Sequence, residues 1–387
     1  MDFGWIDSHI GDNISKLWLK YGREHGDDIL QIEMRRKHHS KFSDVLEENP
    51  HLIFPSSLSA EQSTSCTLAR FHSTLINQGD SVADLTAGLG IDAMAMSKVA
   101  SSVVAVERDE SIANALRINA PNINIITGDC RDIVEKWVQE ENIFDTVFID
   151  PARRDSFGGR VFALDSCEPN VLQLLDNIKK ITNKLIVKAS PMLDISHTIK
   201  ELSPYVDRII ILGTTTECKE LVAVCDFRTE NEIDPLICAV TLSSDTKSEF
   251  IFTRSQEMSS IVNYGIPKVG DVVFDPFPAV MKAAPIRLLG EKFGIKKLGP
   301  NTHLWYAESF VEGFPGTTFR VVDVQSYMSK NIKRYASKYP KVSVTSRNFD
   351  ISSDALRNKL HVSEGPLRLF AVNAIHGNKL LITCERL

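Results

Sequence analysis

Hydrophobic residues in the first part of the chain recur at helical spacing, as at Leu17 and Tyr21, and predict a helical region over residues 1–78. Ser59 is placed as the N-cap of the last helix of this region. That helix is expected to run through Leu75 and to lead directly into the first strand.

Between residues 79 and 228 the pattern changes to short β-branched runs that alternate with helical stretches. This alternation predicts an α/β fold, in which a parallel sheet carries helices on both faces. After a first strand that starts at Ser81, strands are expected at 102–107, 123–127, 146–149, 184–188 and 208–213.

The last pair of strands in this region differs from the others. Ile209–Leu212 and Leu221–Val224 are joined by a short polar link, Thr214–Glu220. A parallel crossover needs a dozen or more residues, so this connection predicts an antiparallel hairpin. A doubly wound sheet that ends in a reversed strand departs from the symmetric dinucleotide-binding fold.

The remaining sequence predicts α+β structure. Residues 229–325 are expected to form a second domain, and residues 326–387 a third that ends in a hairpin with Gly377-Asn378 at its turn. The expected elements of this part are strands near 238–242, 249–253, 303–306, 319–324 and 342–345, and helices near 279–293, 329–338 and 353–361.

Bulk composition agrees with several domains. The chain has 387 residues, of which 43% are hydrophobic and 24% charged, as in soluble globular proteins. No apolar run is long enough to span a bilayer, and the N-terminus does not have the pattern of a signal peptide. The seven cysteines are scattered, so the expected location is a reducing cytoplasm. We expect no membrane association.

Charge is distributed unevenly along the chain. The net charge is −6, yet residues 320–387 hold 12 Lys and Arg against 5 Asp and Glu, which leaves 32 basic and 45 acidic residues elsewhere. This asymmetry indicates a polyanionic partner at the basic end. The alternative is a solvated basic surface that has no partner.

The segment Val82–Gly90 is the start of an ordered series of motifs. A strand ends at Asp84, and the turn Gly88-x-Gly90 follows. Further acids occur where the next three strands end, at Glu107, Asp129 and Asp150. The carboxyl ends of consecutive parallel strands face one crevice, where open α/β sheets bind ligands.

The glycine turn alone leaves the ligand open. Gly88-x-Gly90-x-x-Ala93 also satisfies a nicotinamide-dinucleotide pattern, with Glu107 near the spacing expected for a ribose contact. Asp84 argues against that ligand, because a carboxylate repels a pyrophosphate. It suits S-adenosylmethionine, whose methionine end carries an ammonium group.

The ordered motifs resemble those of class I S-adenosylmethionine-dependent methyltransferases. The resemblance implies a Rossmann-like sheet of seven strands with the last one antiparallel, S-adenosyl-L-methionine as cofactor, and methyltransferase activity. It also implies that Asp84 and the Gly88–Gly90 backbone hold the methionine moiety, that Glu107 accepts the ribose hydroxyls, and that Asp129 with Cys130 flanks the adenine. Thr86, Arg108 and Asp150 are further expected cofactor contacts.

Asp150-Pro151-Ala152-Arg153-Arg154 is the candidate catalytic segment, with Asp150, Pro151 and Arg153 as its site residues. Related nucleic-acid amino-methyltransferases read Asp/Asn-Pro-Pro-aromatic here, so Ala152 and Arg153 depart from that pattern. Arg153 is expected to stack on a base or pair with a phosphate, with Phe157 as a displaced aromatic. Alternatively, Arg153 and Arg154 neutralise Asp155 and Asp165.

Two further features bear on the chemistry of the crevice. Lys188 follows the fifth strand and faces the same crevice, as a contact for substrate or phosphate or as a partner of Asp150 or Asp194. His38-His39 has no further ligand at metal spacing, so no metal site is expected.

The whole chain resembles a bacterial group, known mainly from Bacteroidetes, whose members carry a ferredoxin-like unit and a C-terminal THUMP-like module. Matching stretches include Ile149–Arg154, Ser190–Asp194, Pro300–Leu304 and Gly365–Cys384. THUMP domains bind RNA, so the resemblance implies tRNA or rRNA as substrate and partner. The alternatives are a methyltransferase for protein or small molecules, and a non-catalytic RNA-binding assembly factor.

Overall fold

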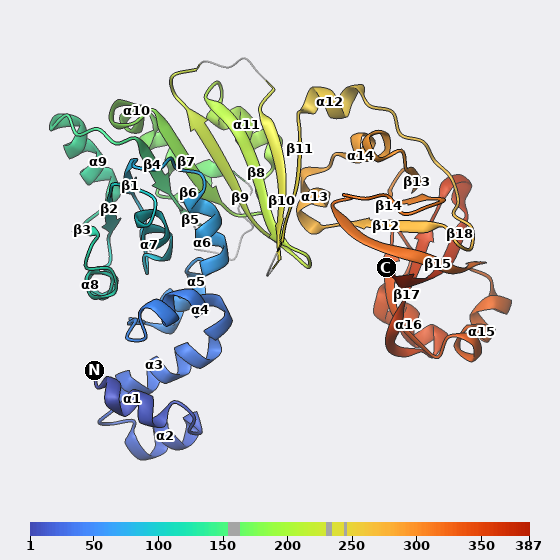
Figure 1. The fold of residues 1–387 in the computed structure, drawn as a ribbon, viewed down its shortest axis with the longest axis horizontal. Helices are drawn as coiled ribbons and strands as arrows, with labels where there is room; N and C mark the ends of the chain where they lie inside the picture. The colour runs from blue at the N-terminus through green and yellow to red at the C-terminus, as the bar shows by residue number, and fades with distance from the viewer. Residues whose placement is uncertain (154–162, 230–233, 244–245) are drawn as a thin grey trace. The chain divides into compact units, whose positions relative to one another are not determined.

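The computed structural model describes residues 1–153, 163–229, 234–243 and 246–387 (Figure 1). The chain folds into two compact units. The first consists of Met1–Asp207 with Val222–Glu232, and the second of Arg208–Leu221 with Ile233–Leu387. In the described part of the chain, no helix has the length and apolar character needed to cross a membrane.

The N-terminal region is helical, as its pattern predicted. Its short helices bury apolar residues such as Ile29, Ile32 and Phe42. The helices are α1 (Phe3–His9), α2 (Ile14–Tyr21), α3 (Gly26–Lys37), α4 (His39–Glu48), α5 (Ser57–Gln62) and α6 (Cys66–Ser73).

The single helix expected from Ser59 to Leu75 was wrong, because two helices occupy this stretch. Ser56 caps α5 in a capping box with Ser59, and Ser65 caps α6 by accepting a hydrogen bond from the Leu68 N–H. Hydroxyl side chains compete with helical backbone bonds and favour caps. The break between α5 and α6 leaves Thr64 outside any helix.

The first sheet has the strand order β11-β10-β8-β9-β7-β4-β1-β2-β3. Strands β3, β2, β1, β4 and β7 pair in parallel. The inner strands β1, β4 and β7 are largely buried, as expected for a sheet covered on both faces. The strands are β1 (Ser81–Asp84), β2 (Ser102–Glu107), β3 (Asn124–Thr127), β4 (Thr146–Ile149), β7 (Lys184–Ala189), β8 (Val206–Thr214), β9 (Cys218–Asp226), β10 (Leu236–Leu242) and β11 (Lys247–Phe252).

The reversed last strand of the expected fold is β9. The Thr214 N–H donates to the Glu217 carbonyl across a tight turn, at 2.8 Å between nitrogen and oxygen, and such a connection requires antiparallel strands. Strand β9 lies between β7 and β8. The prediction of a seven-stranded α/β sheet with its last strand reversed is therefore confirmed for β1, β2, β3, β4, β7, β8 and β9.

Strands β10 and β11 form where the sequence predicted strands, but they pair in an unexpected place. The sequence assigns them to the 229–325 domain, whereas β10 pairs in parallel with β8 of the first sheet and β11 pairs with β10 as the edge strand. An unpaired edge of β8 would expose backbone hydrogen-bonding groups, and β10 covers it. Within β10, residues Ile237, Ala239 and Val240 are buried.

Helices follow the strands of the first sheet, and acidic or amide residues cap several of them. Asp109, Asp129 and Asp194 cap the helices that follow β2, β3 and β7, respectively. The helices are α7 (Ile91–Ser97), α8 (Glu110–Asn119), α9 (Cys130–Gln139), α10 (Val171–Ile181) and α11 (Ile195–Leu202); the short elements β5 (Ala152–Arg153), η1 (Leu164–Ser166) and β6 (Cys167–Glu168) follow β4.

The second sheet has the order β13-β14-β12-β15-β18-β17-β16. One of its faces buries Leu304, Phe319 and Phe370 with their neighbours. The strands are β12 (Val272–Pro276), β13 (Lys296–Gly299), β14 (Thr302–Ala307), β15 (Gly316–Ser326), β16 (Lys341–Arg347), β17 (Ser363–Asn373) and β18 (Lys379–Arg386). The expected closing hairpin is β17–β18, and the boundary expected after residue 325 falls at the end of β15.

Helices of the second unit pack on its sheet and on one another. The helix expected over 279–293 is split, because Ala284 adopts a left-handed conformation and Pro285 interrupts the helical hydrogen bonds. Helices α15 and α16 lie together and enclose Tyr335 and Leu356. The elements are α12 (Arg254–Ser259), α13 (Pro278–Ala283), α14 (Ile286–Phe293), α15 (Ser329–Lys338), α16 (Ser353–Leu360) and η2 (Ile375–Gly377).

Candidate functional site

The turn after β1 places a buried carboxylate beside a glycine turn. Asp84 is 1% exposed, and its Oδ1 accepts a hydrogen bond from the Thr86 N–H at 3.1 Å. No donor among the described residues reaches its Oδ2. Gly88 and Gly90 have positive φ angles of 53° and 83°, which favour glycine. Within the described part of the chain, this carboxylate oxygen thus lacks the partner that an ordinary buried acid would have.

Glu107 binds the same turn through its side chain. Its Oε2 accepts from the Gly88 N–H and its Oε1 from the Asp109 N–H, both at 2.8 Å. Each carboxylate oxygen can accept more than one hydrogen bond. Glu107 therefore holds the backbone of the turn in place, and its oxygens keep acceptor capacity for a ligand hydroxyl.

Asp129 and its neighbours have clear structural roles. Asp129 caps α9, and both of its oxygens accept hydrogen bonds from the Arg131 guanidinium, at 2.9 and 2.5 Å. These bonds lower the pKa of Asp129. Cys130 is buried, which raises the pKa of its thiol to about 12, and Arg108 is exposed. The sequence did not indicate the pairing of Asp129 with Arg131.

The segment after β4 is described only in part. The Asp150 N–H donates to Thr86 Oγ1 at 2.7 Å, which ties β4 to the turn after β1. Pro151 is buried, and Arg153 pairs through its backbone with Cys167. The positions proposed for Arg154, Asp155 and Phe157 lie outside the described residues, as does the side chain of Arg153.

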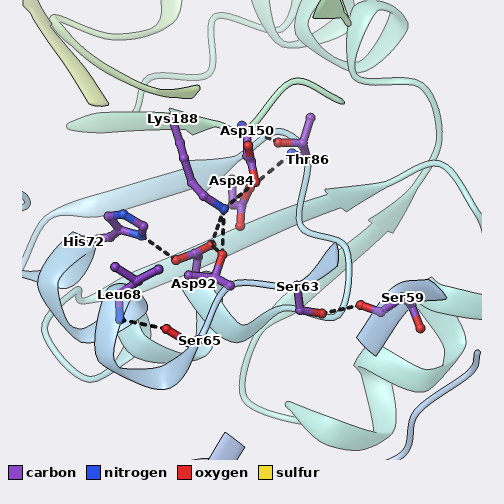
Figure 2. Close-up of polar contacts among 11 residues, drawn as sticks. Ser59, Ser63, Ser65, Leu68, His72, Asp84, Thr86, Asp92, Asp150 and Lys188 are labelled. Carbon is purple, nitrogen blue, oxygen red and sulfur yellow. Dashed lines mark hydrogen bonds and ion pairs between the residues drawn. The ribbon is translucent and has the colours of Figure 1, made fainter. Parts of the chain in front are cut away.

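Lys188 resolves one of the alternatives that the sequence left open, because it pairs with Asp150 rather than with Asp194 (Figure 2). The distance between Lys188 Nζ and Asp150 Oδ2 is 2.5 Å. The ammonium also donates to Thr64 Oγ1 at 2.7 Å. Asp194 instead caps α11.

Asp92 and His72 complete this arrangement, and the sequence patterns pointed to neither of them. Asp92 Oδ2 accepts from the Thr64 hydroxyl and lies 3.6 Å from Lys188 Nζ. Asp92 Oδ1 lies 2.7 Å from Nδ1 of His72, which is fully buried. Asp92 gave no signal in the sequence because an acid in the first turn of a helix is already favoured by the helix dipole. His72 gave none because a single histidine does not indicate which residue it will bind.

The carboxyl groups at these strand ends differ in their ionisation. Burial, followed by repulsion from Asp92, raises the pKa of Asp84 to about 8. Burial also opposes ionisation of Asp92, but Lys188 and His72 outweigh it and lower the pKa of Asp92. Among the described residues, the site therefore holds two carboxylates paired with Lys188, those of Asp92 and Asp150, and one carboxyl, that of Asp84, that no cation pairs with directly. A ligand with a positive group fits this arrangement.

A solved structure resembles the chain along nearly its whole length. The crystal structure of a putative methyltransferase from Porphyromonas gingivalis W83 matches 99% of this chain and 96% of that one, with a TM-score of 0.88 and 28% sequence identity. Residues 273–315 match a ferredoxin-like domain family, and residues 316–386 the family described as THUMP domain-like. The chain thus combines a class I methyltransferase fold with ferredoxin-like and THUMP-like segments, as its sequence resemblance implied.

Other relatives match shorter stretches. An uncharacterised protein of Methanocaldococcus jannaschii is 29% identical over 94 residues, which are 22% of this chain and 32% of that protein. The chain thus spans about a third of this curated relative. A SAM-dependent methyltransferase from Agrobacterium tumefaciens matches 42% of this chain and 60% of its own, at 13% identity and a TM-score of 0.30, a likeness too weak to bear on function.

Proposed function

We propose that the protein is an S-adenosylmethionine-dependent methyltransferase that acts on RNA, either tRNA or rRNA. The observation that carries the proposal is the buried Oδ2 of Asp84, which has no donor among the described residues and lies beside the Gly88–Gly90 turn. A buried acceptor without a partner is costly, so a donor supplied by a ligand is the expected compensation.

The residues around the turn fit this cofactor. The methionine ammonium of S-adenosylmethionine would donate a hydrogen bond to the Asp84 carboxylate. The same carboxylate would repel the pyrophosphate of a dinucleotide. In the described part of the chain, Gly88 has no atom within 4 Å of the position where a Cβ would stand, so the backbone is open to close approach. Glu107 would accept ribose hydroxyls. When bound, the cofactor supplies a methyl group already activated on a sulfonium centre.

The protein's own contribution would then be alignment. Methyl transfer from an activated centre needs little acid–base assistance, and correct placement of the two reactants accounts for most of the acceleration. Asp150 is the residue proposed to face the acceptor. Its side chain is 36% exposed, and its backbone is tied to the cofactor turn through Thr86.

Recruitment of RNA is assigned to the basic C-terminal segment. Helix α15 presents Lys330, Lys333 and Arg334 at the surface, and no acidic partner for them is found among the described residues. Lys338 on the same helix is neutralised by Asp323 at 2.8 Å. A row of unneutralised cations on one helix suits a phosphate backbone, and the match to a THUMP-like family supports this assignment.

The test is transfer of tritiated methyl from S-adenosylmethionine to total RNA of a strain that lacks the gene. We expect label in a fraction that ribonuclease destroys, and mass spectrometry of nucleosides should show one methylated nucleoside missing from the deletion strain. Label that survives ribonuclease and is lost to protease would overturn the RNA assignment. Absence of any label would overturn the activity.

A further inference from the structure

Lys188 is buried in a way that the proposed cofactor site does not explain. Its side chain is 8% exposed, and it extends from β7 between Asp150 and Asp92 (Figure 2). A buried ammonium group is costly unless it is paired and hydrogen-bonded. The surroundings of Lys188 meet this need with Asp150 Oδ2, Thr64 Oγ1 and the more distant Asp92 Oδ2.

The pairing of Lys188 with Asp150 is built into the sheet. Strands β4 and β7 pair in parallel with Ile149 opposite Val187, so the next residue of each strand is also a neighbour. Asp150 is therefore held from two sides: its backbone N–H donates to Thr86, and its carboxylate accepts from Lys188. A carboxylate fixed at both its backbone and its side chain has little freedom to rotate.

A second layer of contacts fixes Lys188 itself. The Thr64 hydroxyl accepts from Lys188 and donates to Asp92, whose other oxygen lies 2.7 Å from His72 Nδ1. Thr64 and His72 both come from the N-terminal helical region, and the break between α5 and α6 places Thr64 at this point. One hydrogen-bonded network thus joins residues from five places in the fold. They are the loop between α5 and α6, helices α6 and α7, strand β7, and the position directly after β4.

We infer that Lys188 is a positioning residue that aligns Asp150 with the methyl acceptor, and that Thr64 and Asp92 hold Lys188 for this task. The inference rests on the proposed function. It also assigns the helical N-terminal region a part in the reaction, because Thr64 and His72 complete the network on one side. Residues from 79 onward would hold the cofactor but would align the acceptor poorly without α5 and α6.

The experiment measures steady-state methyl transfer to total RNA of the deletion strain, with S-adenosylmethionine varied. We compare Lys188→Met with Thr64→Val, which keeps the shape of threonine but removes the hydroxyl. Thr64→Ser, which restores the hydroxyl, is the conservative variant. Lys200→Met is the matched control, since Lys200 is an exposed lysine of the same unit on α11.

We expect kcat to fall roughly 10- to 100-fold in Lys188→Met, as misplacement of a reacting group does, and several-fold in Thr64→Val. The KM for S-adenosylmethionine should stay within about two-fold, because the hydrogen bond from the Asp150 backbone N–H to Thr86 of the cofactor turn does not depend on the Lys188 side chain. Thr64→Ser should recover most of the loss, and Lys200→Met should match the wild type.

Three results would overturn the inference. They are an unchanged kcat in both Lys188→Met and Thr64→Val, a loss confined to KM, and a Thr64→Ser variant as impaired as Thr64→Val. If Lys188→Met does not fold, the Thr64 pair decides alone. A wild-type protein that transfers no methyl at all would instead remove the proposed function, so the two failures are distinguishable.

Discussion

The two sheets of the molecule differ in how their buried charged residues are grouped. At the carboxyl ends of the first sheet, Asp84, Asp92 and Lys188 are buried and close to one another. The second unit fills its core mainly with apolar residues such as Leu304 and Phe370 and keeps the cations of α15 at the surface. It also buries Lys297, whose ammonium donates to the Pro300 carbonyl rather than to a carboxylate. Burial of charge is costly, so the cluster of buried charges on the first sheet is where the proposed chemistry is expected.

This difference follows from topology. Parallel strands end at one edge, so residues far apart in sequence meet there, as Asp150 after β4 and Lys188 on β7 do. Neighbouring strands β12, β14 and β15 pair antiparallel, which distributes their ends to both edges of the sheet. Under the proposed function, the first unit would hold a small charged ligand and the second would present a charged surface to RNA.

The strongest challenge to this comparison is Asp92→Asn. The change weakens the pairing of buried Lys188 and His72, and loss of one partner in such a network costs about 3–5 kcal/mol of stability. Asp132→Asn, an acid in the first turn of α9, is the matched control. Urea unfolding measures the stability of both variants. Equal urea midpoints for Asp92→Asn and Asp132→Asn would contradict the account.

The pH dependence of that effect has a definite sign. The pKa of Asp92 is lowered in the folded protein, so its contribution to stability is present above the unfolded-state pKa of about 4 and is lost as pH falls below it. The difference in unfolding free energy between wild type and Asp92→Asn should therefore shrink under acid conditions. A difference that grows on acidification would contradict the assignment.

Gly90→Ala tests the backbone of the turn and is expected to have the next largest effect. A Cβ at Gly90 would lie 2.1 Å from Leu116 Cδ1, and the φ of 83° adds strain. We expect a loss of about 2–4 kcal/mol. Gly79→Ala is the control, because Gly79 has a similar φ of 85° but open space around it. Equal losses of unfolding free energy in the two variants would show that the clash with Leu116 does not contribute to the effect.

Asp84→Asn should separate binding from stability. It removes the charge that the cofactor's ammonium would meet, so S-adenosylhomocysteine affinity should fall about 10- to 100-fold, the value of a charge-assisted hydrogen bond. The folded-state pKa of Asp84 is about 8. Ionisation therefore destabilises the ligand-free wild type increasingly from about pH 4 to about pH 8.

The thermal midpoint of ligand-free Asp84→Asn should consequently exceed that of the wild type by a few degrees at pH 8, and by less at pH 5. Scanning calorimetry at the two pH values measures this. A variant that loses affinity and stability together would indicate a structural role for Asp84 instead.

The smallest effect concerns the second unit. Replacing Lys330, Lys333 and Arg334 with alanine should weaken RNA binding and lower the slope of log K against log salt by roughly 1 for each phosphate that is no longer neutralised. S-adenosylhomocysteine binding should not change. Lys268→Ala, an exposed lysine of the same unit, is the control. An RNA affinity that is insensitive to the triple change would assign recruitment to another surface.

Sequence reasoning succeeded where a pattern is local. The strand–acid–glycine series located Asp84, Glu107 and Asp150 at the ends of their strands, and the short link after β8 identified the reversed strand. Periodicity missed the break between α5 and α6, where Ser65 caps α6 and Thr64, outside both helices, accepts a hydrogen bond from Lys188.

Pairing at a distance was the main omission. Nothing in the sequence links Thr64 to Lys188 across more than a hundred residues, or His72 to Asp92. Likewise, a strand such as β10 carries no local mark of the sheet whose edge it joins. These pairings are selected by burial and by hydrogen-bond satisfaction in the folded chain, which residue spacing does not encode.

The central claim is that the turn from Asp84 to Gly90 holds S-adenosylmethionine. Isothermal titration of S-adenosylhomocysteine into the full chain tests it most directly. We predict saturable binding at one site per chain, with affinity reduced at least tenfold in Asp84→Asn. No heat of binding to the folded wild-type protein, or equal affinity in the two proteins, would contradict the account.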